Sequence, residues 1–460
     1  MHTELRCITP YDVRGQVPDT FNEDIAARIA LAFAELKRSE HLILGQDVRL
    51  SSPSIAAAVC TALLAHGCDV TDIGLCGTEE MYHAVFNGTG QGIDGGIMLT
   101  ASHNPASYNG MKLVGKGASP ISADNGLIEI ADMAARMQGD APTQNSHLTK
   151  EGHYSLRRDK DAYISDIIKI AAPERMRPLK LVVNSGNGCA GPVLDLLAPH
   201  LPFTFIRLQH EPDGHFPNGV PNPLLPDRRA ATAKAVNQHR ADMGIAWDGD
   251  FDRCFLFDEN GSFIEGYYIV GLLAEAMLHL HPGATILHDP RLVWNTQDIV
   301  QKAGGKPIMV RTGHSFIKEA MRHHNAVYGG EMSAHHYFRD FGYCDSGMLP
   351  WLLVCRLLAE KGQPLSALCA ERVRAYPVSG EINTSITVAP AVVLEALKTR
   401  YADGELDETD GISVSYPRYR FNVRPSNTEP LLRLNVETRA DARLLKDKTE
   451  ELLGLIRSFA

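Results

Sequence analysis

The alternation of strand-like and helix-like segments constrains the fold more than any other feature of this 460-residue chain. HLILGQDVR (41–49) predicts a buried strand, and SSPSIAAAVCTALLAHG (51–67) predicts a helix with a serine cap, an early Pro53 and a closing Gly67. Strands at 68–74 and 95–101 and a helix at 78–86 continue the pattern. This spacing predicts βαβ units around a parallel or mixed sheet.

The same rhythm returns twice along the chain and then changes. LKLVVNSGNGCAG (179–191) starts a second round, and YYIVGLLAEAMLHLHPG (267–283) starts a third. From about residue 373, four segments predict antiparallel strands and two predict helices. The expected fold class is therefore α/β, with three similar mixed-sheet α/β domains (1–152, 153–262 and 263–372) and a C-terminal α+β domain (373–460).

The net charge, the cysteines and the length of the apolar runs exclude several classes of protein. A net charge of −10 argues against a general nucleic-acid or membrane-surface binder, although a local basic cleft could still hold an anionic substrate. The nine cysteines are scattered and contain no Cys-x-x-Cys pair, which is typical of buried thiols in a reducing compartment. The N-terminus lacks the pattern of a signal peptide, and the longest apolar runs are too short to span a membrane. We therefore expect a cytoplasmic enzyme with neither a nucleic-acid nor a membrane partner.

The stretch LTASHNPASYNG (99–110) places a serine and a histidine on a sharp loop that directly follows an apolar strand. The loop lacks the glycines of a hydrolase nucleophile elbow. Ser102 is nevertheless a candidate nucleophile, with His103 beside it.

In GIAWDGDFDRC (244–254), Asp248, Asp250 and Asp252 alternate after another apolar strand. Residues spaced by two in extended backbone point to one side, so the three carboxylates would converge. Like charges so close favour a bound cation, and hard oxygen ligands suit Mg²⁺. A solvated acidic turn would show the same pattern, and Arg253 with the preceding strand favours the metal.

Two further polar loops follow later strands. In YGGEMSAHHYF (328–338), Glu331, Ser333 and His335 could grip sugar hydroxyls, although a polar strand end at the surface would look alike. In RFNVRPSNTEP (420–430) a guanidinium, hydroxyls and turn amides could cradle a phosphate, or form an ordinary turn. Four such loops, one per expected domain, indicate a single composite site, which the four domains would surround as one central cleft.

Six motifs in this order resemble those of the α-D-phosphohexomutases, the phosphomannomutase/phosphoglucomutase enzymes. They are YDVRG (11–15), TASHNP (100–105), DGDFDR (248–253), TGHSFIK (312–318), GEMSAH (330–335) and RPSNTEP (424–430). The resemblance covers essentially the whole chain. It implies an isomerase of carbohydrate metabolism and nucleotide-sugar biosynthesis that moves a phosphate between O1 and O6 of a hexose, through a phosphoserine and a hexose 1,6-bisphosphate.

The resemblance also implies roles for individual residues. Ser102 would carry the phosphoryl group, and its phosphate would hold one Mg²⁺ per chain together with Asp248, Asp250 and Asp252. Arg253 would steady the phosphoserine, and a hexose 1,6-bisphosphate would act as activator.

Further residues would bind the substrate or move protons. Tyr11 and Arg14 would line the site near the phosphoserine. His103 and His314 are acid/base candidates, and Lys112 is a proton shuttle or a charge partner. Glu331 and Ser333 would contact O3 and O4 of the sugar, with His335 nearby; Arg291 matches a looser motif. The phosphate that is not being transferred would be held by Arg424, Ser426, Asn427 and Thr428. Pro425 and Ala334 depart from the smaller residues usual in the family.

Alternatives remain open at this point. A serine-dependent phosphomonoesterase would also need a serine and metal carboxylates, but it would normally recruit a second metal. A sugar-phosphate sensor could keep the fold without the reaction. Within the family, GEMS resembles enzymes acting on mannose and glucose phosphates, whereas glucosamine mutases more often show GEQS. We expect mannose as the main sugar, glucose as a second one, small sugar phosphates as the only partners, and a monomer or dimer.

Overall fold

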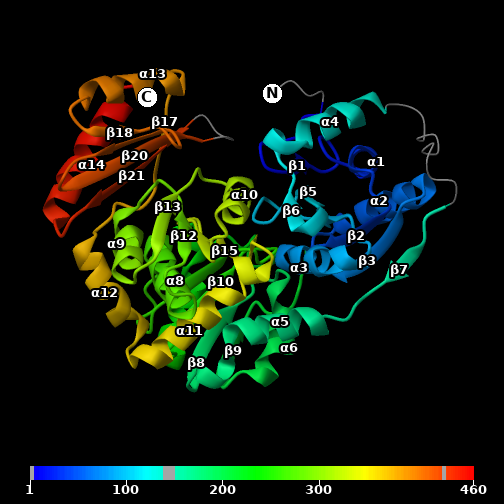
Figure 1. Cartoon of the computed structure of the whole chain (residues 1–460), viewed down its shortest axis with the longest axis horizontal. Coiled ribbons are helices and arrows are strands. Elements are labelled where there is room, and N and C mark those ends of the chain that lie inside the picture. Colours follow the sequence, from blue (N-terminus) through cyan, green and yellow to red (C-terminus); the bar gives the residue numbers. More distant parts are fainter. Residues whose placement is uncertain (1–4, 138–150, 427–430, 460) are drawn as a thin grey trace. The chain divides into compact units, whose positions relative to one another are not determined.

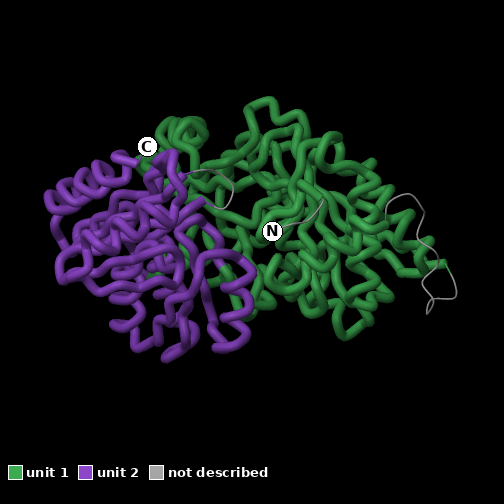
Figure 2. The backbone as a smooth tube through the Cα atoms, turned by 90° about the horizontal axis from the view of Figure 1, so that it is seen from above, with its two compact units in different colours: residues 1–262, 337–360 green, residues 263–336, 361–460 purple. Residues whose placement is uncertain are grey.

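The chain divides into two structural units, and each unit is formed by two segments that are distant in sequence (Figure 2). The structure is a computed structural model that describes residues 5–137, 151–426 and 431–459. Unit 1 comprises residues 1–262 and 337–360, and unit 2 comprises residues 263–336 and 361–460. The α/β fold class expected from the sequence is confirmed.

The first sheet of unit 1 is mixed, with strand order β1-β5-β4-β2-β3-β7 and β6 paired with β5 (Figure 1). β4, β2, β3 and β7 run parallel, whereas β5 is antiparallel to both β4 and β1. The strands are β1 (Val13–Gln16), β2 (His41–Gln46), β3 (Asp69–Leu75), β4 (Gly95–Leu99), β5 (Tyr108–Gly115), β6 (Ser119–Pro120) and β7 (Tyr154–Leu156). The helices are α1 (Glu23–Lys37), α2 (Ser52–His66), α3 (Thr78–Gly88) and α4 (Leu127–Arg136). Buried β2 and β4 explain the continuous apolar runs in the sequence, because helices cover both faces of such sheets.

The start of α2 corrects one detail of the sequence analysis. Gly67 ends the helix in the left-handed region at φ 95°, as expected, but Ser51 makes no capping hydrogen bond. Its hydroxyl instead accepts a hydrogen bond from Asn109 Nδ2 on β5 at 2.9 Å. A tertiary partner has therefore replaced the local cap.

The second sheet of unit 1 has the order β11-β10-β8-β9, with only β11 antiparallel to its neighbour. Its elements are α5 (Asp161–Ala171), β8 (Leu179–Asn184), α6 (Ala190–Leu197), β9 (Phe203–Leu208), α7 (Ala230–His239), β10 (Met243–Trp247) and β11 (Cys254–Phe257). The later segment of unit 1 contains the antiparallel strands β15 (His336–Phe338) and β16 (Cys344–Asp345), which are not part of this sheet, and then α11 (Leu349–Lys361). Trp351 of α11 packs edge-on against Trp247 of β10, with ring centroids 6.4 Å apart.

Unit 2 contains a parallel layer and an antiparallel sheet. β12 (Thr285–His288) pairs in parallel with β13 (Lys306–Met309) and β14 (Tyr328–Gly330). The helices of this part are α8 (Gly266–Leu280), α9 (Trp294–Lys302), α10 (His314–His324) and α12 (Leu365–Ala375).

The C-terminal part is the α+β arrangement expected from the sequence. Its antiparallel sheet has the order β17-β21-β20-β19-β18, and side chains of the sheet and both helices share one apolar core. The elements are β17 (Ile382–Ser385), α13 (Pro390–Arg400), β18 (Glu405–Asp407), β19 (Ile412–Ser415), β20 (Tyr419–Pro425), β21 (Leu431–Thr438) and α14 (Ala442–Arg457).

Candidate active site

Ser102 lies in unit 1 on the loop between β4 and β5. It occupies the left-handed region, at φ 49°, and is 3% exposed. Its backbone N–H donates to Thr100 Oγ1 at 2.9 Å. A left-handed residue other than glycine costs about 1–2 kcal/mol. The loop therefore needs support from its surroundings.

Arg49 provides that support. Its guanidinium donates hydrogen bonds of 2.7–2.9 Å to four carbonyl oxygens of the loop. The acceptors are the carbonyls of Ser102, Asn104, Pro105 and Tyr108. The side chain is fully buried, so each of these bonds forms away from water, where a broken bond is costly.

The charge of Arg49 is balanced locally. Its Nε lies 3.2 Å from Asp47 Oδ2, and its guanidinium lies over the ring of Phe216, 5.6 Å from the centroid. Asp47 also accepts hydrogen bonds from Ser52 Oγ and from the Arg49 N–H. The Ser102 loop thus rests on a buried, paired arginine.

The three aspartates of the second motif converge, but not through extended backbone as the sequence analysis assumed. β10 ends at Trp247 and β11 begins at Cys254, and the residues between them form a turn. Phe251 within this turn adopts a φ of 43°. A reversal of the chain, rather than strand alternation, brings the carboxylates together.

The two loops meet at the serine. Ser102 Oγ donates to Asp248 Oδ2 at 2.7 Å, and Arg253 Nε donates to the same oxygen at 2.8 Å. Ser102 Oγ also lies 3.1 Å from His103 Nδ1, which accepts from the Arg253 guanidinium. A Cβ at Gly249 would lie 2.7 Å from the Ser102 carbonyl oxygen, so only glycine permits this approach.

Lys112 of β5 and Thr78 of α3 hold the other two carboxylates. Lys112 Nζ lies 2.8 Å from Asp250 Oδ2 and 2.5 Å from Asp252 Oδ2. Thr78 donates its hydroxyl to Asp250 Oδ2 at 2.6 Å and its N–H to the Asp250 carbonyl at 3.0 Å. We call Ser102, Lys112, Asp248, Asp250, Asp252 and Arg253 the serine–aspartate cluster.

The carboxylates of this cluster differ in their protonation. Burial raises the pKa of Asp248 to about 7, with Arg253 opposing the shift and the other two aspartates adding to it. Burial and Asp252 act to raise the pKa of Asp250 as well, but Lys112 and Thr78 outweigh them and lower it. Burial opposes the charge on Lys112, yet Asp250 and Asp252 raise its pKa overall, so it is a cation.

The cluster fits a divalent cation. One carboxylate oxygen from each aspartate lies within 4.8 Å of the others, and all three residues are buried. Asp250 Oδ1 is buried and has no hydrogen-bond partner in the described part of the chain, so this oxygen could bind a further ligand. Such a hard oxygen set suits Mg²⁺.

Arg14 also reaches the serine loop. From β1 it donates to Asn104 Oδ1 at 2.5 Å and lies 3.4 Å from the Ala101 carbonyl oxygen. Asp12 accepts from its Nε at 2.8 Å. Tyr11 is half-buried and lies two residues before Val13, the first residue of this strand.

In unit 2, Glu331, Ser333 and His335 follow β14 on a turn rather than on extended backbone. The Ala334 N–H donates to the Glu331 carbonyl at 3.0 Å, and Ala334 has a φ of 71°. The turn brings two of these side chains close to each other. His335 Nδ1 lies 3.6 Å from Glu331 Oε2.

Arg291 and His314 come to the same turn. Arg291 is 3% exposed; its Nη2 lies 2.7 Å from Asp289 Oδ2, 3.9 Å from Glu331 Oε1 and 3.4 Å from Ser333 Oγ. Burial opposes its charge, but Asp289 raises the pKa of Arg291 overall. His314 is the first residue of α10, and the N–H before it, that of Gly313, donates to Glu331 Oε1 at 3.0 Å.

Arg424 and Ser426 lie at the end of β20 in unit 2. Arg424 Nη2 is 3.4 Å from Glu381 Oε2, and Arg433 of β21 reaches Glu381 Oε1 at 3.1 Å and Ser426 Oγ at 3.5 Å. Asn427 and Thr428, the other two expected phosphate contacts, lie outside the described residues.

Sequence comparison identifies the family. The chain matches all four domains described as phosphoglucomutase/phosphomannomutase: alpha/beta/alpha domain I at residues 8–137, domain II at 161–261, domain III at 265–376 and the C-terminal domain at 382–454. The chain belongs to the phosphoglucomutase/phosphomannomutase family. It is an enzyme of the isomerase class, a phosphohexomutase.

The alignments with relatives cover nearly the full length of this mutase and of each relative. Phosphohexose mutases of Xanthomonas campestris are 55% identical over 457 residues, covering 98% of this chain and 99% of the relative. A phosphomannomutase of Escherichia coli is 54% identical over 462 residues, covering 99% and 100%. A solved phosphoglucomutase/phosphomannomutase family protein of Burkholderia thailandensis has 30% sequence identity and a TM-score of 0.86, covering 100% of this chain and 99% of that one.

The mutase also contains polar residues in these clusters that the sequence analysis did not single out. They are Arg49, Thr78, Asp289 and Glu381. For Arg49 the one available signal was its place at the carboxyl end of the strand expected at 41–49, because such strand ends carry function in these sheets. Thr78 and Glu381 lie in segments whose local pattern shows nothing unusual.

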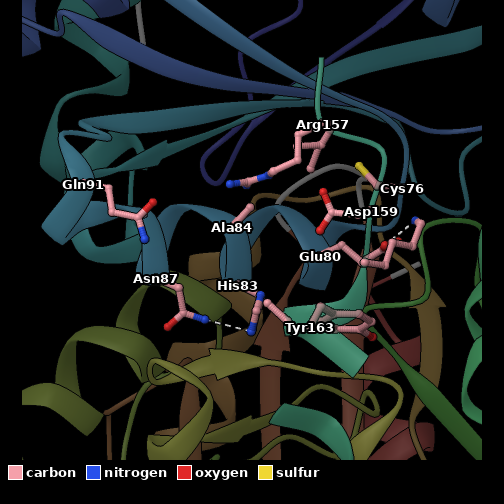
Figure 3. Close-up of a pocket in the computed structure, with 13 residues that line it drawn as sticks. Cys76, Glu80, His83, Ala84, Asn87, Gln91, Arg157, Asp159 and Tyr163 are labelled. Carbon is pink, nitrogen blue, oxygen red and sulfur yellow. Dashed lines mark hydrogen bonds and ion pairs between the residues drawn. The ribbon is translucent and has the colours of Figure 1, made fainter. Parts of the chain in front are cut away.

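A cavity of about 150 Å³ in unit 1 lies beside α3 and the chain leading into α5 (Figure 3). Lys160 pairs with Glu80 there, and His83 lies 2.9 Å from Asp166 and 2.8 Å from Asn87. These groups satisfy one another, so their arrangement serves packing between α3 and α5.

No helix among residues 5–137, 151–426 and 431–459 is both long and apolar enough to cross a membrane.

Proposed function

We propose that this phosphohexomutase interconverts hexose 6-phosphate and hexose 1-phosphate, with mannose as its main sugar and glucose as a second one. A phosphoserine at Ser102 and a hexose 1,6-bisphosphate carry the phosphoryl group between the two positions. The mannose assignment is supported by the GEMS motif and by relatives named phosphomannomutase. The enzyme works in the cytoplasm as a monomer or dimer, with hexose 1,6-bisphosphate as activator.

The observation that carries the proposal is the 2.7 Å hydrogen bond between Ser102 Oγ and Asp248 Oδ2. It puts the Ser102 hydroxyl against a buried carboxylate that a cation and Arg253 can share. A phosphoryl group on Ser102 would bring about −1.5 to −2 charges into this place. Arg253 beside it, and a Mg²⁺ on the aspartates, are the charges that such a group needs.

The chain's own residues have distinct tasks in the transfer. The bond from Ser102 Oγ to phosphorus breaks while a sugar oxygen forms a new bond to the same phosphorus, and the sugar hydroxyl gives up its proton. Arg253 and Arg14 neutralise charge around the serine, and Lys112 acts as a charge partner, since its two carboxylate partners keep it protonated. When bound by Asp248, Asp250, Asp252 and the serine phosphate, Mg²⁺ would stabilise negative charge on the transferring group.

The proton of the sugar hydroxyl needs an acceptor close to the reacting atoms. His103 lies 3.1 Å from the Ser102 hydroxyl, and His314 begins α10 beside the Glu331 turn of unit 2. We assign both as acid/base candidates, one for each cluster.

Unit 2 binds the sugar phosphate. Glu331 and Ser333 contact O3 and O4, with His335 and Arg291 beside them, and Tyr11 of unit 1 lines the serine side. Arg424, Ser426, Asn427 and Thr428 hold the phosphate that is not transferred. Because mannose and glucose differ only at C2, a grip on O3 and O4 accepts both.

Intact mass spectrometry tests the proposal directly. The enzyme is treated with a phosphatase, repurified, and incubated with glucose 1,6-bisphosphate. We expect one phosphoryl group, located on Ser102 by peptide analysis and removed again by excess hexose 6-phosphate. Coupled assays on the same preparation should show faster turnover of mannose 1-phosphate than of glucose 1-phosphate and glucosamine 1-phosphate. Stoichiometric release of inorganic phosphate from these substrates would instead indicate a phosphomonoesterase.

A further inference from the structure

Three arginines of unit 2 share a single carboxylate. Glu381 Oε2 lies 3.6 Å from Arg291 Nη1 and 3.4 Å from Arg424 Nη2, and Glu381 Oε1 lies 3.1 Å from Arg433 Nη1. We call these four residues the arginine cluster. Its geometry follows from the sheet: Arg424 and Arg433 are directly opposed on β20 and β21, and Glu381 immediately precedes β17, the strand on the other side of β21.

This cluster has more donors than acceptors. The Nε atoms of Arg291, Arg424 and Arg433 are all buried, and none has a hydrogen-bond partner among residues 5–137, 151–426 and 431–459. Arg291 is also paired with Asp289 at 2.7 Å, and Arg424 Nη1 lies 3.9 Å from Asp410 Oδ2. Buried N–H groups are normally paired, so the three Nε groups are donors that an anionic ligand could use. Arg291 and Arg424 are the more buried two, with side-chain exposures of 3% and 10%.

The arginines also repel each other. Directly opposed like charges destabilise a strand pair, and here Arg424 and Arg433 are such a pair. Burial lowers the pKa of Arg424, and Arg291 and Arg433 lower it further. The three arginines together lower the pKa of Glu381 against the effect of its own burial, so it is ionised. Asp289 and Asp410 also face single arginines, but Glu381 contacts all three and so bridges the cluster.

We propose that Glu381 is an internal stand-in for phosphate, which holds Arg291, Arg424 and Arg433 together in the free enzyme and competes with the substrate's phosphate for their N–H groups. This inference rests on the proposed function, in which Arg424 binds the phosphate that is not transferred. It adds Arg433 and Arg291 as phosphate-binding residues and gives Glu381 a role that opposes binding.

Competition has a purpose in a reaction that must release its ligand. A mutase has to let go of the distal phosphate when the bisphosphate turns over and when product leaves. A carboxylate at 22% exposure, beside the same guanidinium groups, can take back these contacts as the phosphate departs. Glu381 would therefore weaken binding but keep the empty cluster stable.

The test is isothermal titration of inorganic phosphate, and separately of mannose 6-phosphate, into phosphatase-treated full-length enzyme. Glu381→Gln keeps the shape and an acceptor oxygen but removes the competing charge. We expect its Kd for both ligands to fall by about threefold to tenfold, which corresponds to a modest, partly screened ion pair. Glu395→Gln, on an exposed position of α13, makes the same charge change and should leave both Kd values unchanged.

The arginines provide the matching arm. Arg433→Gln should raise both Kd values by about tenfold if its guanidinium contacts the phosphate. Arg443→Gln at an exposed position of α14 is its control. Thermal unfolding adds a second readout, because Glu381→Gln should lower Tm without ligand and should show a larger rise in Tm on adding phosphate than the parent enzyme.

The outcomes separate this inference from the proposed function. If Arg424→Gln weakens binding but Glu381→Gln leaves it unchanged or weakens it, the phosphate site stands and the stand-in role is overturned. If Arg424→Gln has no effect on either ligand, the phosphate is held elsewhere and the proposed clamp itself is wrong.

Discussion

The serine–aspartate cluster of unit 1 and the arginine cluster of unit 2 differ in how closely their charged groups are paired and how far they are buried. In the first, nearly every charged group has short contacts to two or more partners, and all the members except Lys112 are at most 3% exposed. In the second, the shortest contact of the shared carboxylate is 3.1 Å, and Glu381 and Arg433 are exposed by 22% and 27%.

The difference fits the two tasks that the proposed function gives to these clusters. Atoms that exchange a covalent bond must be held within a few tenths of an ångström, because misplacement costs rate steeply. A group that must bind and release an anion many times gains from contacts that can be exchanged. Substitutions in the first cluster should therefore reduce kcat, and substitutions in the second should alter KM.

Removing the serine hydroxyl should have the largest effect. Ser102→Ala takes away the phosphoryl carrier, so we expect kcat to fall by roughly a thousandfold or more, since no other group can form the covalent intermediate. Circular dichroism and Tm should stay close to those of the parent, because alanine tolerates the same backbone. Substantial remaining mutase activity, or a phosphoryl group on another serine, would remove the reaction centre from unit 1.

The metal should come next. Asp250→Asn leaves a neutral ligand beside Lys112, and we expect kcat to fall by about a hundredfold, with a higher Mg²⁺ concentration needed for half-maximal rate. Chelation should abolish the activity of the parent, and added Mg²⁺ should restore it. Asp227→Asn at an exposed position is the control. An unchanged Mg²⁺ dependence in Asp250→Asn would refute the assignment of this ligand.

Support for the serine loop should matter almost as much. Lysine cannot donate to four carbonyl oxygens at once, so Arg49→Lys should lower kcat by about tenfold to a hundredfold with little change in KM. The rate of Ser102 phosphorylation by glucose 1,6-bisphosphate should fall in parallel. Arg158→Lys, at a side chain that is 57% exposed, should change neither. A loss of Tm without a loss of kcat would reduce Arg49 to a purely structural role.

In the arginine cluster the effect should move to KM. Arg424→Ala removes a charged contact to the distal phosphate, so KM for both the 1-phosphate and the 6-phosphate should rise by about tenfold or more. Phosphorylation of Ser102 by small phosphate donors should change far less. Equal losses of kcat in both directions with unchanged KM would contradict the expectation that the arginine cluster acts on substrate binding.

The smallest effect concerns a buried acid behind the first cluster. Glu79 of α3 accepts hydrogen bonds from Tyr163, from the Gly347 N–H and, at 3.1 Å, from the Met348 N–H; burial raises its pKa to about 8 against their opposition. A carboxyl pKa that is higher in the folded state gives stability that is complete below pH 4.5 and is lost as pH rises through 8.

Glu79→Gln mimics the neutral acid, so its Tm should vary less between pH 5 and pH 8 than that of the parent. The corresponding difference in the free energy of unfolding should be at most a few kcal/mol. The kcat at pH 7 should stay within about twofold, since Glu79 touches no reacting atom. A parent enzyme that gains stability over this pH range would show that Glu79 is ionised when folded.

The sequence predicted the fold class well, because strand and helix periods are local properties. β2, α2 and β4 lie where their patterns indicated them, and the C-terminal change to antiparallel strands is present. The domain limits at residues 152, 262 and 372 stay predictions. Tertiary partners were invisible, as Ser51 shows: its hydroxyl accepts from a distant strand instead of capping its helix.

The candidate site was predicted as four loops. Ser102 and the three aspartates come together in unit 1, and Arg291, Glu331 and His335 lie close in unit 2. The backbone expected for the aspartates was wrong, because the positive φ of Phe251 goes against the ordinary preference of such a residue. Arg49 was missed for another reason. Its side chain binds backbone carbonyl oxygens of residues more than 50 positions away. Every residue has a backbone carbonyl, so the sequence does not show which ones an arginine will bind.

The approach of the two loops at Gly249 has a consequence for synthesis of the chain. The Ser102–Asp248 bond links residues 146 positions apart, and the Thr78–Asp250 bond links residues 172 positions apart. Contacts of such long separation form only after the intervening chain has been ordered. Under the proposed function, a nascent chain would therefore have no reaction centre until the turn after β10 has left the ribosome and docked, and incomplete chains would be inert instead of partly active.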